Sequence, residues 1–152
     1  MIEFLFLDLD DTILDFHKAE SVAIRKTLQC AGIDPTEENT ALYSVINKRH
    51  WEMLERGEIT REELKVQRFA RLFEALGVEE DARATADEYV RQLGIGHYFL
   101  PGAEEAVMAL SRKYRLFLAS NGIASVQKGR LTSANLYRFF EKVFISEEVG
   151  AN

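Results

Sequence analysis

The 152-residue sequence has one cysteine and no long apolar run. A single thiol, Cys30, cannot form an internal disulfide, and without a cluster of cysteine and histidine residues the sequence does not suggest a zinc site. The longest apolar runs are far shorter than the roughly 20 residues of a membrane-spanning helix. No basic segment precedes an apolar stretch and a cleavage site, so we expect no secretory signal. These absences predict a soluble, cytoplasmic protein that does not act at a membrane.

Positive charge is also scarce. The sequence has 19 Lys and Arg residues against 25 Asp and Glu residues, which gives a net charge of −6. This balance argues against a protein that holds a nucleic acid polymer by its overall charge, and leaves open only a local basic patch. The composition, 47% hydrophobic and 29% charged, excludes a wholly disordered chain. The length suits one domain, or a small core with one insertion.

Short apolar segments alternate with helical patterns at the two ends of the chain. Strands are predicted at residues 2–7, 116–119 and 142–146, and helices at residues 103–113 and 124–135. The first strand is apolar on both faces, which predicts a buried strand covered by helices on each side. Strands that alternate with helices favour a parallel sheet with right-handed crossovers. The predicted fold class is therefore α/β, with a Rossmann-like core.

The middle of the chain, residues 16–98, has a different pattern. Helix-like segments follow one another, glycines lie near their ends, and no strand pattern interrupts them. Thr60 and Glu63 have the spacing of a capping box at the start of one such segment. We predict two domains: an α/β core of residues 1–15 and 99–152, and an all-α helical bundle of residues 16–98 inserted into it.

Polar residues follow the first two predicted strands. Asp8 and Asp10 come after the first, and Ser120 and Asn121 end the second. Ligands of open α/β sheets bind at this end of the strands. Clustered carboxylates favour Mg²⁺, which takes oxygen ligands and keeps waters that a phosphate can replace. One carboxylate can attack phosphorus while its neighbour moves protons, and a hydroxyl with backbone amides suits the phosphate. An acidic turn without a role is the alternative for the two aspartates alone.

Residues 6–12 resemble the first motif of the haloacid dehalogenase (HAD) superfamily, Asp-x-Asp-x-Thr, and residues 118–122 resemble its second motif. The helical insertion directly after the first motif resembles the C1-type cap of that family. Within the superfamily, residues 47–51, 57–60 and 145–150 are most similar to the pyrimidine 5′-nucleotidase group. This resemblance implies a Mg²⁺-dependent phosphatase that hydrolyses a small phosphomonoester, a nucleoside 5′-monophosphate in the first place, through an aspartyl-phosphate.

The same resemblance implies roles for individual residues of the core. Asp8 would be the nucleophile and a Mg²⁺ ligand, and Asp10 the general acid and base that also binds the metal through its backbone carbonyl. Ser120 and Asn121 would bind the transferring phosphoryl group. Thr12 would belong to the same phosphate site and would stabilise its loop. An acid at position 10 argues against a true dehalogenase, which needs no proton donor there.

In the cap, the resemblance implies three substrate-facing residues, Asn47, Lys48 and Trp51. The Asn47 amide could read a base, and the Trp51 indole could stack on it. Packing within the cap is the alternative for Trp51, and a solvated charge is the alternative for Lys48.

The third and fourth motifs of the family, a lysine and an acidic pair, lie beyond the third strand, where this sequence stops. We therefore expect the sequence to be the N-terminal part of a longer protein. Without that part, the strand that carries Asp8 would be an apolar sheet edge, which invites association. The alternatives are another HAD phosphatase, acting on a sugar phosphate or phosphoglycolate, and, for a chain that ends at Asn152, a non-catalytic module that binds phosphate or forms a homodimer through the sheet edge.

Overall fold

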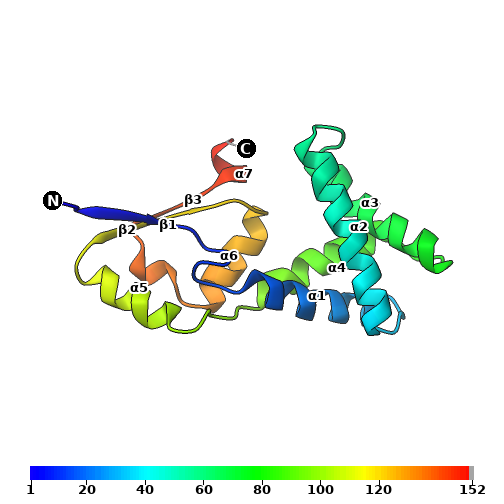
Figure 1. Cartoon of the computed structure of the whole chain (residues 1–152), viewed down its shortest axis with the longest axis horizontal. Coiled ribbons are helices and arrows are strands. Elements are labelled where there is room, and N and C mark those ends of the chain that lie inside the picture. Colours follow the sequence, from blue (N-terminus) through cyan, green and yellow to red (C-terminus); the bar gives the residue numbers. More distant parts are fainter. Residues whose placement is uncertain (151–152) are drawn as a thin grey trace. The chain divides into compact units, whose positions relative to one another are not determined.

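A computed structural model describes residues 1–150 of the chain (Figure 1). Strands alternate with helices at the two ends of this part, and helices alone fill its middle. The elements in chain order are β1 (Phe4–Leu7), α1 (Phe16–Cys30), α2 (Glu37–Glu55), α3 (Arg61–Leu76), α4 (Ala82–Ile95), α5 (Ala103–Ser111), β2 (Arg115–Ser120), α6 (Ala124–Ser133), the 3₁₀ turn η1 (Tyr137–Phe139), β3 (Lys142–Ile145) and α7 (Ser146–Val149).

The chain forms two compact units. The α/β unit consists of Met1–Glu20 and the segment from Leu93 onward, and the helical unit is Ser21–Gln92. The division runs through α1 and α4, a few residues inside the boundaries expected from the sequence. The two helix ends lie with the α/β unit because they contact α6: the Phe16 ring lies 5.7 Å from the Arg130 guanidinium, and Gly94 touches Gly129.

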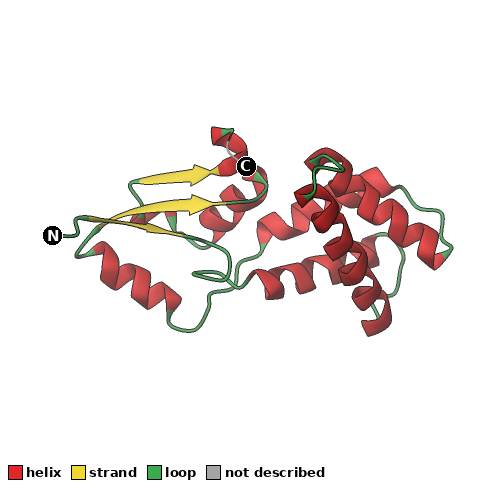
Figure 2. Cartoon of the chain, turned by 45° about the horizontal axis from the view of Figure 1, so that its top comes forward, coloured by secondary structure: helices red, strands yellow, loops and turns green. Residues whose placement is uncertain are grey.

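The α/β unit contains a parallel sheet with the strand order β1-β2-β3 (Figure 2). Phe6 of β1 lies beside Phe117 of β2, and Ser120 of β2 lies beside Ile145 of β3. This arrangement confirms the predicted α/β class and the parallel sheet. Each strand begins and ends within two residues of its predicted bounds, because short apolar runs between helical patterns are a strong local signal.

One face of the sheet carries the core of this unit. Leu116 and Leu118 of β2 are buried in one cluster with Val107 of α5 and Leu131 of α6. Burial of each of these aliphatic side chains contributes roughly 1.5–3 kcal/mol. The cluster attaches α6 to β2, so that the residues of α6 lie at a set position relative to the end of that strand.

The opposite face of the sheet carries exposed aromatic rings. Phe4 is 53% and Phe6 is 58% exposed, and the Phe6 ring stacks on Phe117 with 5.2 Å between the centroids. Successive side chains of a strand point to opposite faces, so Leu5 and Leu7 pack on the core while the two phenylalanines do not. Within residues 1–150, the prediction that helices cover β1 on both sides is therefore wrong. In this part of the chain β1 is an edge strand.

The helical unit has an aromatic core. The rings of Tyr43 (α2), Phe69 (α3) and Tyr89 (α4) lie 5.5–5.7 Å from one another. At the start of α3, Thr60 Oγ1 accepts from the Glu63 amide at 3.2 Å, and the Glu63 carboxylate accepts from the Thr60 amide at 2.8 Å. These reciprocal bonds confirm the predicted capping box. Among residues 1–150, no helix is both long and apolar enough to cross a membrane.

Candidate active site

The backbone after β1 folds into a tight turn. The Leu9 carbonyl accepts hydrogen bonds from the amides of Ile13 at 2.9 Å and Leu14 at 3.0 Å. Asp11 adopts a φ of 58°, in the left-handed region that aspartate enters more readily than most residues. The Asp11 carboxylate then accepts from the Phe16 amide at 3.2 Å, at the start of α1. This turn ends the strand, so that the chain no longer continues in the direction of β1 after Asp8 and Asp10.

An open pocket of about 450 Å³ lies at the carboxyl end of the sheet. Four residues singled out from the sequence line it together, although they come from two strands more than 100 positions apart. The lining consists of Asp8, Asp10, Ala119, Ser120, Asn121, Phe144, Ser146 and Val149. Thr12 lies exposed in the turn, outside this lining. The pocket has the place that ligands take in open α/β sheets.

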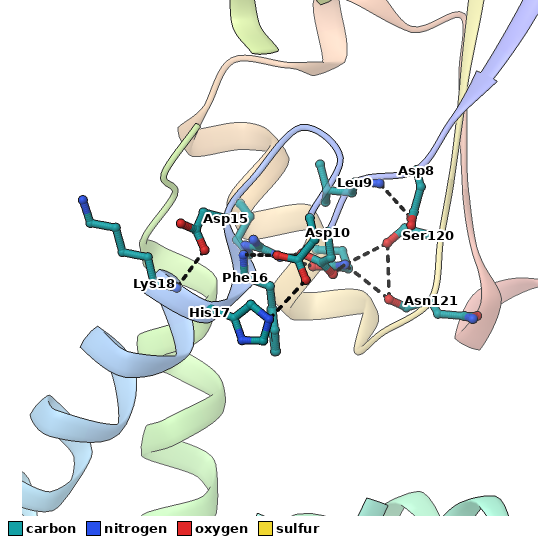
Figure 3. Close-up of polar contacts among 12 residues, drawn as sticks. Asp8, Leu9, Asp10, Asp15, Phe16, His17, Lys18, Ser120 and Asn121 are labelled. Carbon is teal, nitrogen blue, oxygen red and sulfur yellow. Dashed lines mark hydrogen bonds and ion pairs between the residues drawn. The ribbon is translucent and has the colours of Figure 1, made fainter. Parts of the chain in front are cut away.

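Asp8 is the exposed carboxylate of the pocket. Its Oδ1 accepts a hydrogen bond from the backbone amide of Leu9 at 2.8 Å, as Figure 3 shows. This bond restrains the rotation of the side chain while the group stays accessible to solvent. An accessible, oriented carboxylate is what a nucleophile at this position requires.

Asp10 is held differently, by side chains of α6. Its Oδ1 pairs with the Nη1 of Arg130, and its Oδ2 accepts from the Nε2 of Gln127 at 2.8 Å. The Asp10 side chain is 27% exposed, whereas the Arg130 side chain is fully buried. The same Nε2 of Gln127 lies 2.8 Å from Ser120 Oγ. Asp10 and Ser120 are thus connected through the side-chain amide of Gln127.

Gln127 and Arg130 were not singled out from the sequence. Their signal was present but weak: they lie three positions apart on the helix after the second motif, among the buried residues Val126 and Leu131. Polar residues on an apolar helix face are uncommon unless they are paired. The sequence did not show which carboxylate pairs with them, because Asp10 lies 117 and 120 positions away.

The three candidate residues of the cap lie in the helical unit, on α2. Asn47 is buried, with 6% exposed, and its Oδ1 accepts from the Nη1 of Arg68 at 3.0 Å. Lys48 is exposed, and Trp51 is 36% exposed. The Asn47 amide oxygen is thus bonded to Arg68 within the helical unit.

The chemistry of the donor set suits a hard cation. Within residues 1–150, no group of three or more His, Cys, Asp or Glu side chains is placed to bind a metal. Mg²⁺ needs fewer, because it is usually bound by one or two carboxylates together with waters and substrate phosphate oxygens. Asp8, with its exposed carboxylate, and Asp10 both line the pocket and offer oxygen atoms of this kind. No lysine or arginine is among the described lining residues to offset their charge.

Comparison with known proteins assigns the family. The family model for haloacid dehalogenase-like hydrolases matches residues 2–152. The chain belongs to the haloacid dehalogenase-like hydrolases. This confirms the resemblance of the two motifs, and the match includes both the α/β unit and the helical unit.

Two curated relatives of this HAD hydrolase are similar over almost all of its length. Pyrimidine 5′-nucleotidase PynA of Streptococcus pneumoniae (strain ATCC BAA-255 / R6) is 38% identical over 148 residues, which are 97% of this chain and 62% of the relative. HAD-hydrolase YfnB of Bacillus subtilis (strain 168) is 36% identical over 146 residues, 96% of this chain and 62% of the relative. The chain thus spans about three fifths of the length of these two relatives.

A solved structure supports the same assignment. The crystal structure of YfnB, which is described as bound to magnesium, superposes with a TM-score of 0.92 at 34% identity and covers 99% of this chain and 66% of that one. A further HAD structure, the L-2-haloacid dehalogenase from Xanthobacter autotrophicus, has a TM-score of 0.68 at 18% identity over 99% of this chain and 59% of that one, which shows a shared fold alone.

Proposed function

We propose that this HAD hydrolase is a Mg²⁺-dependent phosphatase that hydrolyses a small phosphomonoester through an aspartyl-phosphate on Asp8. The observation that carries the proposal is the pocket in which an exposed carboxylate, a tethered second carboxylate and the end of β2 meet. The size of about 450 Å³ suits a small ligand. An acid at position 10 favours phosphatase over dehalogenase chemistry, because only the former needs a proton donor for the leaving oxygen.

In the first half of the proposed reaction, an Asp8 carboxylate oxygen attacks phosphorus. The new oxygen–phosphorus bond forms as the ester oxygen–phosphorus bond breaks, and protonated Asp10 gives its proton to the leaving alkoxide. Ser120 and Asn121, with Thr12 supporting the loop, bind the transferring phosphoryl group. Mg²⁺, held by the Asp8 carboxylate and the Asp10 carbonyl, would offset the negative charge of the phosphate and the carboxylates.

In the second half, ionised Asp10 takes a proton from water. The resulting hydroxide attacks phosphorus, the bond between Asp8 and phosphorus breaks, and inorganic phosphate leaves. Asp8 returns as a carboxylate and Asp10 is again protonated, so that both residues are restored. The two roles of Asp10 require one carboxylate that reaches both the leaving group and the water.

For the substrate, we propose a nucleoside 5′-monophosphate. This is supported by the similarity to a relative named pyrimidine 5′-nucleotidase and by the cap residues. The partly exposed Trp51 indole offers a stacking face, and the Asn47 amide, with its oxygen bonded to Arg68, offers an NH₂ donor to a carbonyl oxygen of a base. Lys48 offers a cation. Sugar phosphates and phosphoglycolate remain the alternative substrates within the same chemistry.

The test uses the complete natural gene product, with its reading frame followed past Asn152. Phosphate release is measured with nucleoside monophosphates, a sugar phosphate and phosphoglycolate, with Mg²⁺ and with a chelator. We expect release that requires Mg²⁺ and is highest with a nucleoside monophosphate. Asp8→Asn should abolish it, whereas Asp87→Asn, at an exposed position of α4, should not. Retained activity of Asp8→Asn would refute the aspartyl-phosphate mechanism.

A second candidate is a non-catalytic module that binds phosphate or forms a homodimer. Its supporting observation is β1, an edge strand within residues 1–150 with Phe4 and Phe6 more than half exposed. Light scattering of the gene product after size exclusion distinguishes the two: an inactive dimer supports the module, and an active monomer removes it. Cytoplasmic location stays a prediction, which fractionation of cells tests.

A further inference from the structure

Two buried polar side chains of α6, Gln127 and Arg130, bond to residues that line the pocket. Gln127 is 2% exposed, and its Nε2 lies 2.8 Å from both Asp10 Oδ2 and Ser120 Oγ. An amide nitrogen has two hydrogens, so it can donate to both oxygens at once. One side chain thus sets the position of Asp10, from the first motif, relative to Ser120, from the second.

Arg130 completes this arrangement one helical turn later. Its Nη1 pairs with Asp10 Oδ1 and also donates to Gln127 Oε1 at 3.0 Å. Both oxygens of the Asp10 carboxylate are therefore bonded to α6, and the two α6 side chains are bonded to each other. A carboxylate with both oxygens engaged is restricted to one orientation.

The backbone leaves room for these side chains. Gly122 has a φ of 149°, and a Cβ at this position would lie 3.2 Å from the Gln127 amide nitrogen. Gly129, directly before Arg130, lies against Gly94, where a Cβ would come within 2.3 Å of the Gly94 carbonyl oxygen. A side chain at either position would push on Gln127 or displace α6, and with it Arg130.

Stability alone does not explain a buried arginine here. Burying an ion pair costs about as much desolvation as the pair recovers, so apolar side chains of similar size stabilise a core as well or better. Arg130 also has two buried nitrogens, Nε and Nη2, without a hydrogen-bond partner in the described part of the chain. What distinguishes the arginine is its partner, since Asp10 lines the pocket.

We propose that Gln127 and Arg130 are positioning residues that fix the orientation of the Asp10 carboxylate at the pocket and its position relative to Ser120. The proposal rests on the phosphatase function proposed above. Both residues contact the Asp10 carboxylate, and they act through it rather than on the substrate. If this holds, their loss matters most where the reaction depends most on proton donation.

The test measures this dependence in the complete gene product. The ester p-nitrophenyl phosphate has a good leaving group, which departs with little help from a proton donor. Uridine 5′-monophosphate releases an alkoxide, and this leaving group depends on a proton from the general acid. Single-turnover rates of alcohol release are measured for both esters, so that the later attack of water does not contribute. General acid catalysis supplies about 10²–10⁴-fold, so we expect Arg130→Met to lose about 100-fold with uridine 5′-monophosphate and to change little with p-nitrophenyl phosphate.

Three further variants complete the design. Asp10→Asn is the reference, because it removes the acid itself and should show the same selective loss. Arg130→Lys keeps the cation and should recover part of the rate. Arg112→Met, at an exposed arginine of the same unit, is the matched control and should leave both rates unchanged. If Arg130→Met does not fold by circular dichroism, Gln127→Met tests the same selective loss.

The outcomes separate the two proposals. A wild-type protein that releases no phosphate from either ester contradicts the phosphatase function. An active wild type whose Asp10→Asn variant is selective, while the Arg130 and Gln127 variants lose both esters equally or neither, overturns the positioning role alone. A selective loss in the Arg130 and Gln127 variants supports it.

Discussion

Within residues 1–150, each of the two units buries one arginine, and the two arginines are paired in different ways. In the α/β unit, Arg130 is fully buried and pairs with the carboxylate of Asp10. In the helical unit, Arg68 is 3% exposed, donates to the neutral amide of Asn47, and lies 4.7 Å from the ring centroid of Tyr89. The first pairing ends at the pocket and the second ends in an aromatic core. The partner of a buried arginine, rather than its burial, thus shows whether the residue is connected to the pocket.

The energetic difference follows from the partners. A guanidinium beside a carboxylate is compensated by a full opposite charge, and removal of that charge leaves the cation buried alone. A guanidinium over aromatic faces is compensated by several weaker interactions, none of which is decisive. We therefore expect the α/β unit to be the more sensitive to loss of a single partner.

The largest effect is expected for Asp10→Ala. It leaves Arg130 buried without a carboxylate and should lower the free energy of unfolding by about 3 kcal/mol, the lower end for a broken buried pair, because the Asp10 side chain is 27% exposed. Urea denaturation measures it, with Asp87→Ala on the surface of α4 as the control. In an Arg130→Met background the same change should cost much less. Equal costs in both backgrounds would show that the pair does not stabilise the fold.

A smaller effect is expected for Asn47→Leu in the helical unit. Arg68 then loses its hydrogen-bond acceptor but keeps the rings of Phe69 and Tyr89, so the cost should be about 1–2 kcal/mol. Ser44→Ala, at an exposed position of the same helix, is the control. A cost as large as that of Asp10→Ala would remove the distinction between the two arginines.

The smallest effect is expected for an ion pair near the surface. Glu88 accepts from Arg91 Nε at 2.8 Å and from Gln92 at 2.6 Å, and these bonds, with Arg91 the larger cause, lower the pKa of Glu88 to about 2. A lowered carboxylate pKa adds stability that is complete above the ordinary value of 4.5 and is lost as the pH falls toward 2. Solvent screening keeps this contribution below about 1 kcal/mol.

Glu88→Gln tests this expectation by removing the titrating group. Thermal denaturation between pH 5 and pH 2 should show a slightly shallower fall in stability for the variant than for the wild type, since one carboxylate less is lost on acidification. The two proteins should differ more at pH 5 than at pH 2. A difference of several kcal/mol would mean that surface pairs of the helical unit matter as much as the buried pair of the α/β unit.

Local patterns in the sequence predicted the elements well. The capping box of Thr60 and Glu63 needs only residues three positions apart, and the strands around Leu116 and Val143 are short apolar runs between helices. Such features depend on neighbouring residues, which the sequence displays directly. The exposure of Phe4 and Phe6 was not predictable in this way, because an apolar strand does not show which of its faces is covered.

The residues of the candidate site differ in the same way, because some could be recognised from the sequence and others could not. Asp8, Asp10, Ser120 and Asn121 were recognisable from the sequence because they follow strands, and a parallel sheet brings the ends of its strands to one edge. Only the tertiary structure showed that Gln127 and Arg130 belong to the site, because they contact Asp10 across more than 100 positions of the sequence. The sequence determined which groups end the strands. Only the packing of α6 against the sheet decided which buried groups hold Asp10. Hydrogen-bond and ion-pair partners depend on proximity and charge in the folded chain, and not on spacing along the sequence.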